Sequence, residues 1–152
     1  TRYILDITQP KKLHVIDLWD LLGDSWEHWG IHGPTTAEAL TLVRTTYAAE
    51  IDAGQVDVHV ADDLELLPTF DDDYFDWVYI DTSHTYEHCL AELAIVADKV
   101  KDGGIICGDD WTSDPTHPHH GVYLAVNEFI TTQPYSLLHG SDTDLQWAIT
   151  RQ

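Results

Sequence analysis

The chain has 152 residues and carries 27 Asp and Glu against 7 Lys and Arg, a formal net charge of −20 at pH 7. A surface of this charge repels nucleic-acid phosphates and anionic membranes, so we expect neither nucleic acid nor a membrane as a partner. The length predicts one domain over residues 1–152, and no apolar run approaches the ~20 residues of a membrane span.

The ends and the cysteines give two further expectations. The sequence contains no Met and begins at Thr1, so we expect the natural N-terminus to lie upstream and the domain to be incomplete at that end. Cys89 falls in a predicted helix and Cys107 in a predicted strand. Such positions favour free buried thiols over a disulfide, which predicts a reducing, cytoplasmic compartment.

The first predicted strand ends in an acid. Residues 1–9 are ambiguous between a helix end and a short strand, and Leu13–Ile16 then predicts a strand that stops at Asp17. An acid in this place in a nucleotide-binding sheet accepts hydrogen bonds from ribose hydroxyls. The alternative is a solvated or helix-capping Asp17.

A loop, a helix and a second strand follow. Residues 18–34 hold three Trp, three Gly and two His, which suggests a lid or substrate loop, or else a loop whose tryptophans cover the core. Thr35 or Thr36 can cap a helix that Gly54 ends. Residues 56–60 alternate as in a strand.

The central stretch reads strand, helix, strand. Trp77–Ile80 and Gly104–Gly108 are short apolar runs typical of buried strands, and Thr85–Lys101 has the spacing of an amphipathic helix. Gly103 suits the left-handed stop of that helix. Two parallel strands joined in this way have their carboxyl ends at the same edge of the sheet, where open α/β folds bind ligands.

Acids follow both central strands. Asp81 follows the first strand and Asp109 and Asp110 follow the second, so we expect these carboxylates to converge. Because the chain has few cations to balance them, they predict a divalent metal site, with Mg²⁺ preferred and Ca²⁺ or Mn²⁺ as alternatives. Solvated acids at strand ends are the competing interpretation.

His84 lies three residues after Asp81 and is the candidate general base, since a histidine titrates near neutral pH. The ring has a structural alternative, which is to cap the helix or bond a loop. A rival motif overlaps it: residues 84–88 match H-x-x-E-H, in which two histidines on one helix hold Zn²⁺ and Glu87 acts as base.

The C-terminal part predicts a loop, a helix and two strands. Residues 112–120 contain His117, His119 and His120. Histidine clusters can bind Zn²⁺ or Ni²⁺, but no Cys or carboxylate lies at ligand spacing, so we expect an exposed loop near the site. A helix over residues 121–131 and strands over 135–139 and 145–150 follow.

The central motifs resemble a known family. They are YIDTSHTY at residues 79–86, KDGGIICGDDW at 101–111, and Gly121-Val122 before a helix. Together they are similar to class I S-adenosylmethionine-dependent methyltransferases, in the branch of metal-dependent small-molecule and sugar O-methyltransferases. The resemblance implies a Rossmann-like methyltransferase sheet, mostly parallel with an antiparallel C-terminal strand. The first strand and its Gly-rich cofactor turn would be missing from this chain.

The resemblance also implies roles for single residues. Asp81, Asp109 and Asp110 would hold Mg²⁺, with Asp81 also bordering the cofactor. Asp17 would bind the ribose of S-adenosylmethionine, and Asp62 its adenine amino group. His84 would be the catalytic base.

The function expected is Mg²⁺-assisted O-methylation of a small hydroxylated molecule, a sugar or a phenol. The alternatives are a truncated fold kept as a non-catalytic binding or assembly module, and another metal-dependent enzyme on the same scaffold. A homo-oligomer stays open, because a sheet opened at its central strand needs something to cover that edge.

Overall fold

The computed structural model describes residues 2–19 and 36–152. Its contacts divide the chain into two units, Thr1–Asp63 and Leu64–Gln152, each of which is considered by itself. The single domain expected from the length stays a prediction. The predicted lid or substrate loop at residues 18–34 lies almost wholly outside the described residues.

The first unit contains a pair of parallel strands. Its elements are α1 (Arg2–Thr8), β1 (Leu13–Asp17), α2 (Thr36–Thr46), α3 (Ala48–Asp52) and β2 (Val56–Val60). The ambiguous start of the chain is therefore helical. The single helix expected before Gly54 is divided at Tyr47, and Gly54 ends α3 with a left-handed φ of 72°. Asp17 pairs with Val60 at the carboxyl edge of the two strands.

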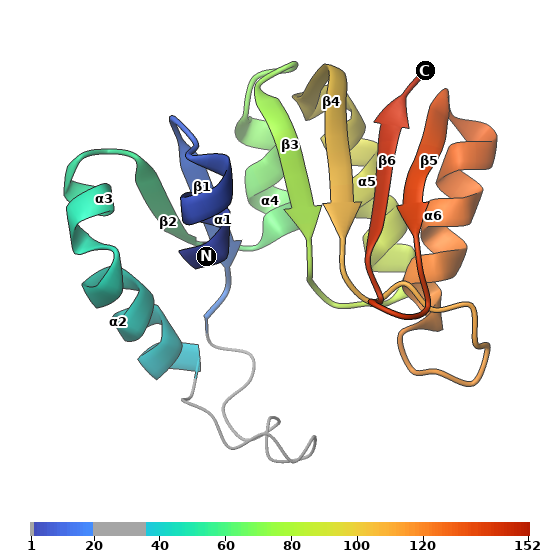
Figure 1. Cartoon of the computed structure of the whole chain (residues 1–152), viewed down its shortest axis with the longest axis horizontal. Coiled ribbons are helices and arrows are strands. Elements are labelled where there is room, and N and C mark those ends of the chain that lie inside the picture. Colours follow the sequence, from blue (N-terminus) through green and yellow to red (C-terminus); the bar gives the residue numbers. More distant parts are fainter. Residues whose placement is uncertain (1, 20–35) are drawn as a thin grey trace. The chain divides into compact units, whose positions relative to one another are not determined.

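The second unit contains a sheet of four strands in the order β3-β4-β6-β5. The elements are α4 (Asp63–Leu66), η2 (Leu67–Thr69), β3 (Phe75–Ile80), α5 (Tyr86–Lys99), β4 (Val100–Gly108), α6 (His120–Thr132), β5 (Tyr135–Gly140) and β6 (Trp147–Arg151). β3 and β4 are parallel, and β6 is antiparallel to both β4 and β5. The predicted α/β fold, with parallel strands and an antiparallel C-terminal end, is confirmed (Figure 1).

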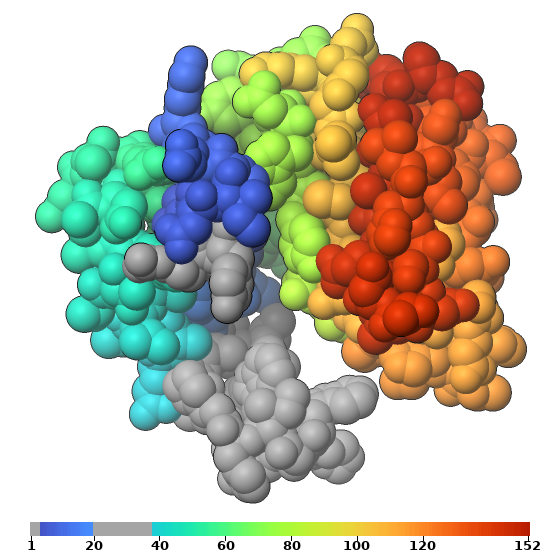
Figure 2. Space-filling model, viewed as in Figure 1, coloured from blue at the N-terminus to red at the C-terminus, as the bar shows by residue number. Residues whose placement is uncertain are grey.

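The core of this unit lies between the sheet and two helices. Figure 1 shows α5 and α6 on the same face of the sheet. The side chains that meet there are fully buried: Leu93, Val96, Ile106, Ala125, Val126 and Ile149. On the side turned toward the viewer in Figure 2, β5 and β6 lie at the surface, in red. Packing of α5 and α6 against this face holds the strands in place. The carboxyl ends of the strands lie at the edge of the sheet, outside this packing.

The predicted role of Gly103 is wrong. Helix α5 ends at Lys99, and Val100 both caps it and begins β4. Val100, which is buried, pairs with Phe75, whereas Trp77 pairs with Ile105, so β4 bulges between these pairs. Gly103 has the expected left-handed φ of 76°, but it serves this bulge.

Both cysteines are free, as expected, and both thiols are chemically shielded. Burial raises the pKa of Cys89 to about 12 and that of Cys107 to about 11. We expect both to react with a disulfide reagent at pH 8 at least about 100-fold more slowly in the folded chain than in urea, because the thiolate is the nucleophile. Complete reaction of the folded chain within the time of the unfolded control would contradict this.

Of the helices that the structure describes, none combines the length and the apolar character required to cross a bilayer.

Candidate active site

The carboxyl ends of β3 and β4 meet at one edge, as the sequence predicted. Asp81 follows β3 directly, and Asp109 and Asp110 follow β4. The amide of Asp109 donates a hydrogen bond to the carbonyl of Ile80 (3.1 Å), so the two strand ends are joined at that point. Three acids from two separate parts of the chain are thereby brought to the same edge of the sheet.

His84 lies between two of these acids. Its Nε2 is 3.2 Å from Oδ1 of Asp81 and 2.9 Å from Oδ2 of Asp110. The hydrogen bond to Asp81 raises the pKa of His84, burial opposes this, and the charge of Asp110 raises it further. The ring therefore binds its proton more firmly than a histidine in water.

A second histidine reaches the same carboxylate. Nδ1 of His119 is 2.8 Å from Oδ1 of Asp110, and the ring centroids of His84 and His119 are 4.4 Å apart. His84, Asp110 and His119 each offer a ligand atom, all within 4.8 Å of one another. We call these three residues the His-Asp-His cluster. The expectation that the histidine loop has no carboxylate partner is wrong, because Asp110, nine residues before His119, contacts its ring.

A glycine brings the histidine loop to this position. A Cβ on Gly121 would lie 2.6 Å from the amide nitrogen of Tyr86 and 3.0 Å from the carbonyl oxygen of His84. The first turn of α6 therefore packs directly on the backbone of the loop before α5, at a distance that only glycine allows. Since His119 immediately precedes α6, this contact sets where its ring meets His84.

Two residues of the cluster have an unusual backbone conformation. His84 has a φ of 58° and Asp110 a φ of 63°, both in the left-handed region. Residues other than glycine adopt this region at a cost, and such positions concentrate at functional sites. The conformation directs both side chains toward the same place at the sheet edge.

Asp109 is held in a different way. Its Oδ1 accepts hydrogen bonds from Nε2 of Gln146 (2.7 Å) and from the amide of Asp110 (2.8 Å). Its carbonyl accepts one from Nε1 of Trp147 (3.0 Å), and the hydroxyl of Tyr79 donates to Gln146 (2.8 Å). The sequence did not indicate Gln146. The predicted cage of three carboxylates stays a prediction.

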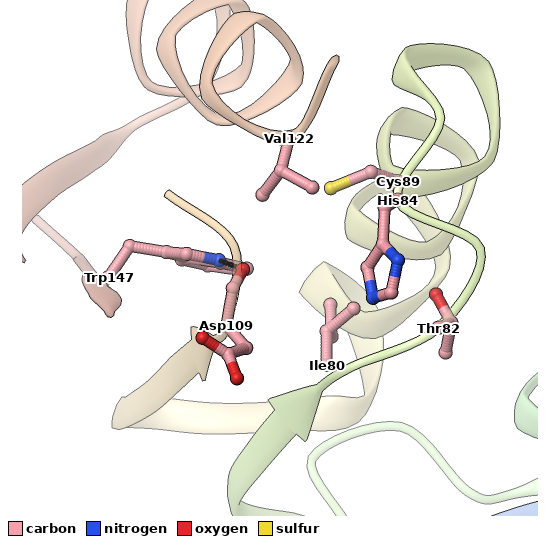
Figure 3. Close-up of a pocket in the computed structure, with 7 residues that line it drawn as sticks. All are labelled: Ile80, Thr82, His84, Cys89, Asp109, Val122 and Trp147. Atoms are coloured by element: carbon pink, nitrogen blue, oxygen red, sulfur yellow. Dashed lines mark hydrogen bonds between the residues drawn. The ribbon is translucent and has the colours of Figure 1, made fainter. Parts of the chain in front are cut away.

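A small cavity of about 10 Å³ opens beside the cluster, enough for roughly one water molecule. It is lined by Ile80, Thr82, His84, Cys89, Asp109, Val122 and Trp147. Figure 3 shows the ring of His84 and the side chains of Cys89 and Val122, from α5 and α6, around this space. Thr82 is fixed by donating to the buried carboxylate of Glu92 (2.7 Å).

The rival zinc-protease motif does not have the geometry it requires. Helix α5 begins at Tyr86, so His84 lies before the helix and does not share a helical face with His88. His84 contacts Asp81 and Asp110, whereas Nε2 of His88 lies 3.8 Å from Glu92. The H-x-x-E-H match therefore does not form the zinc site of a protease.

The two acids predicted to bind the nucleoside lie at one edge in the first unit. Asp17 ends β1, and the amide of Ala61 donates to its carbonyl (3.2 Å), which places Asp62 one residue further along. Oδ1 of Asp17 accepts a hydrogen bond from the amide of Trp19 (2.7 Å), and the residue is exposed. Their roles toward a nucleoside stay predictions.

The first unit also contains a histidine pair that the sequence did not indicate. Nδ1 of His14 on β1 lies 3.0 Å from Nε2 of His59 on β2, and Asp57 lies beside them. Burial, and then the nearby His59, lower the pKa of His14. Lys12 forms an ion pair with Asp57, so a positive charge already occupies this carboxylate.

Comparison with known proteins gives a family and a fold. A family model described as a methyltransferase domain matches residues 1–111. No curated protein matches the sequence. Among solved structures, the chain is similar to the SAH-bound methyltransferase PaMTH1 of Podospora anserina, with 14% identity and a TM-score of 0.63 over 99% of this chain and 75% of that chain.

Two further solved structures are similar. The O-methyltransferase NovP has 20% identity and a TM-score of 0.60, over 99% of this chain and 65% of that one. CalS11, a TDP-rhamnose 3'-O-methyltransferase of calicheamicin biosynthesis, has 16% identity and a TM-score of 0.54, over 91% and 58%. At these identities the likeness concerns the fold. The chain spans only 60% and 46% of two other similar structures.

Proposed function

Because the chain belongs to the methyltransferase-domain family, we propose that it transfers a methyl group from S-adenosylmethionine to a hydroxyl of a small molecule. The family match confirms the recognition made from the central motifs. The observation that carries the proposal is the convergence of Asp81, His84 and Asp110 at the carboxyl edge of β3 and β4, where folds of this type bind ligands.

The acceptor class follows from charge and from the similar structures. A net charge of −20 disfavours nucleic acid and anionic membranes. NovP is named as an O-methyltransferase, and CalS11 as one that acts on TDP-rhamnose. A hydroxylated small molecule, a sugar or a phenol, is therefore the proposed acceptor. A homo-oligomer remains part of the proposal.

The nucleoside part of the cofactor would lie at the carboxyl edge of β1 and β2. The exposed Asp17 offers a carboxylate for ribose hydroxyls. Asp62 directly follows Ala61, whose amide donates to the carbonyl of Asp17, and it is the proposed partner of the adenine amino group. The SAH in the PaMTH1 structure supports this choice of cofactor. Residues 1–12, which precede β1, include no glycine, so this segment does not contain the Gly-rich turn that would contact the methionine part.

The chemistry divides between the cofactor and the chain. S-adenosylmethionine, when bound, supplies the methyl group on a sulfonium. The chain has to orient the acceptor hydroxyl and favour loss of its proton. His84 lines a cavity at the sheet edge and is the candidate to accept that proton. Asp81 and Asp110 stabilise the protonated ring, as the raised pKa of His84 indicates.

A divalent cation would add to this. The predicted ligands are Asp81, Asp109 and Asp110, and carboxylates alone would select Mg²⁺, with Ca²⁺ or Mn²⁺ as alternatives. Such an ion supplies Lewis acidity that favours the deprotonated acceptor. Asp81 and Asp110 both lie within hydrogen-bond distance of Nε2 of His84, so this nitrogen borders the proposed ion site.

Cofactor binding tests the proposal. We expect calorimetry to show S-adenosylmethionine binding to the chain, and Asp17→Ala to weaken it at least about tenfold, because the ribose contacts are lost. Asp52→Ala, an exposed acid of α3, is the matched control and should bind as the unaltered chain does. Absence of binding to the unaltered chain would favour a non-catalytic binding or assembly module.

A further inference from the structure

Two histidine side chains lie at the sheet edge where the sequence predicted a metal site made of carboxylates alone. His84 and His119 each contact one oxygen of Asp110, at 2.9 and 2.8 Å. We infer that His84, Asp110 and His119 form a site for a borderline transition-metal ion, Zn²⁺ or a first-row neighbour, in preference to Mg²⁺. This rests on the proposed function only for the use of the ion; the site itself is argued from its own donors.

The donor set decides between the ions. Mg²⁺ takes oxygen ligands in octahedral geometry and keeps several waters, whereas imidazole nitrogen suits zinc, iron, copper and nickel. The His-Asp-His cluster offers two nitrogens and a carboxylate within 4.8 Å of one another. Asp81, 3.2 Å from Nε2 of His84, adds a second carboxylate. This set does not fit Mg²⁺ well, whereas zinc sites combine histidine nitrogens with carboxylate oxygens in this way.

The positions of the donor atoms are fixed by the backbone. His84 comes from the loop before α5, Asp110 follows β4, and His119 precedes α6, so three segments meet at this point. His84 and Asp110 are held in left-handed conformations, and the contact of Gly121 with the loop before α5 sets the approach of His119. The three side chains are only 26%, 16% and 22% exposed. A site prepared in this way loses little freedom when an ion binds.

The inference changes the role of His84. In the structure its Nε2 lies within hydrogen-bond distance of Asp81 and Asp110, and an ion would take the place of the proton there. With the ion bound, the ring is a ligand and is not available as the base. The inference also gives a role to His119, which the carboxylate prediction leaves without one.

Metal binding by the intact chain is the direct test. His59→Ala is used as the background, because His14, Asp57 and His59 also offer ligand atoms within 4.8 Å of one another and could compete for the ion. We expect one Co²⁺ per chain with visible absorption bands of nitrogen coordination. Zn²⁺ should displace the Co²⁺, and millimolar Mg²⁺ should not. This measurement needs no change in the cluster itself.

Variants then assign the ligands. His119→Ala and His84→Gln should each lower Zn²⁺ affinity, measured against a chromophoric chelator, by about 10- to 100-fold or more. His139→Ala is the matched control, because His139 pairs with the single carboxylate of Asp144 and is half exposed. It should leave the affinity unchanged. Far-UV circular dichroism and urea midpoints establish that each variant is folded.

Several outcomes would overturn the inference. These are displacement of Co²⁺ by Mg²⁺ at similar concentration, a Co²⁺ spectrum of oxygen ligands only, and unchanged Zn²⁺ affinity in folded His119→Ala and His84→Gln. Binding of S-adenosylmethionine is measured on the same samples. If S-adenosylmethionine binds but Co²⁺ and Zn²⁺ do not bind as expected, only the inferred metal site is rejected. If Zn²⁺ binds and the cofactor does not, the site stands and the proposed methyl transfer falls.

Discussion

Gly108→Ala should lower the free energy of unfolding of the unit Leu64–Gln152 by about 3 kcal/mol, at the upper end of overpacking effects. A Cβ at this position would lie 2.4 Å from the carbonyl oxygen of Ile80 and 2.7 Å from the ring of Trp147. The first contact is with the backbone of a paired strand, which cannot turn aside. Trp147 is 1% exposed, and its Nε1 donates to the carbonyl of Asp109, which holds the ring in place.

Urea unfolding followed by tryptophan fluorescence measures this effect. Gly103→Ala is the control, because a Cβ there would meet nothing within 4 Å and only the φ of 76° opposes it. That variant should lose about 1 kcal/mol, the cost of a left-handed residue with a side chain. Equal losses in the two variants would show that the contact with Ile80 and Trp147 does not limit this position.

Asp110→Asn should reduce methyl transfer at least about 100-fold, comparable to removing one key electrostatic group from an active site. Asp110 accepts from His84 through one oxygen and from His119 through the other. An amide of the same shape replaces one acceptor by a donor and removes the negative charge. Asn tolerates the left-handed conformation of this residue, so the fold should be retained.

The measurement is kcat/KM with a hydroxylated acceptor, beside S-adenosylmethionine affinity. We expect the affinity to change less than about threefold, because the residues proposed to bind the nucleoside are Asp17 and Asp62. Asp76→Asn is the control, since Asp76 forms an exposed ion pair with Lys101 that contributes little. Full activity in Asp110→Asn would remove the cluster from the mechanism.

The sequence was sufficient to predict the elements around the site. The apolar runs before Asp81 and Asp109 have the length and composition of buried strands, and a helix between them requires a parallel crossover. From this alone the two strand ends had to meet. His84 was found for the same reason, since it lies three residues after Asp81, which follows a strand end already expected to face the site.

His119 could not be predicted in the same way. Its contact with Asp110 depends on how closely α6 packs on the loop before α5, which is a tertiary distance set by Gly121. The one available signal was a glycine directly after a run of histidines, at the start of a helical pattern. Gln146 was missed because an amide shows no charge pattern, and its partner Asp109 is distant in the chain.

Gly103 shows how a local rule gives way to tertiary structure. A glycine after an amphipathic run is typical of a helix stop, and its φ has the expected sign. Val100, however, gains burial by pairing with Phe75, so extended backbone begins before the glycine. The strained residues His84 and Asp110 were equally invisible, because nothing in the residue types requires left-handed backbone there.

That strain has a consequence for the evolution and engineering of this chain. Glycine in place of His84 or Asp110 would relax the backbone, so selection for heat resistance alone would tend to remove the very residues that give the edge its chemistry. Variants selected only for heat resistance should therefore often have lost the activity.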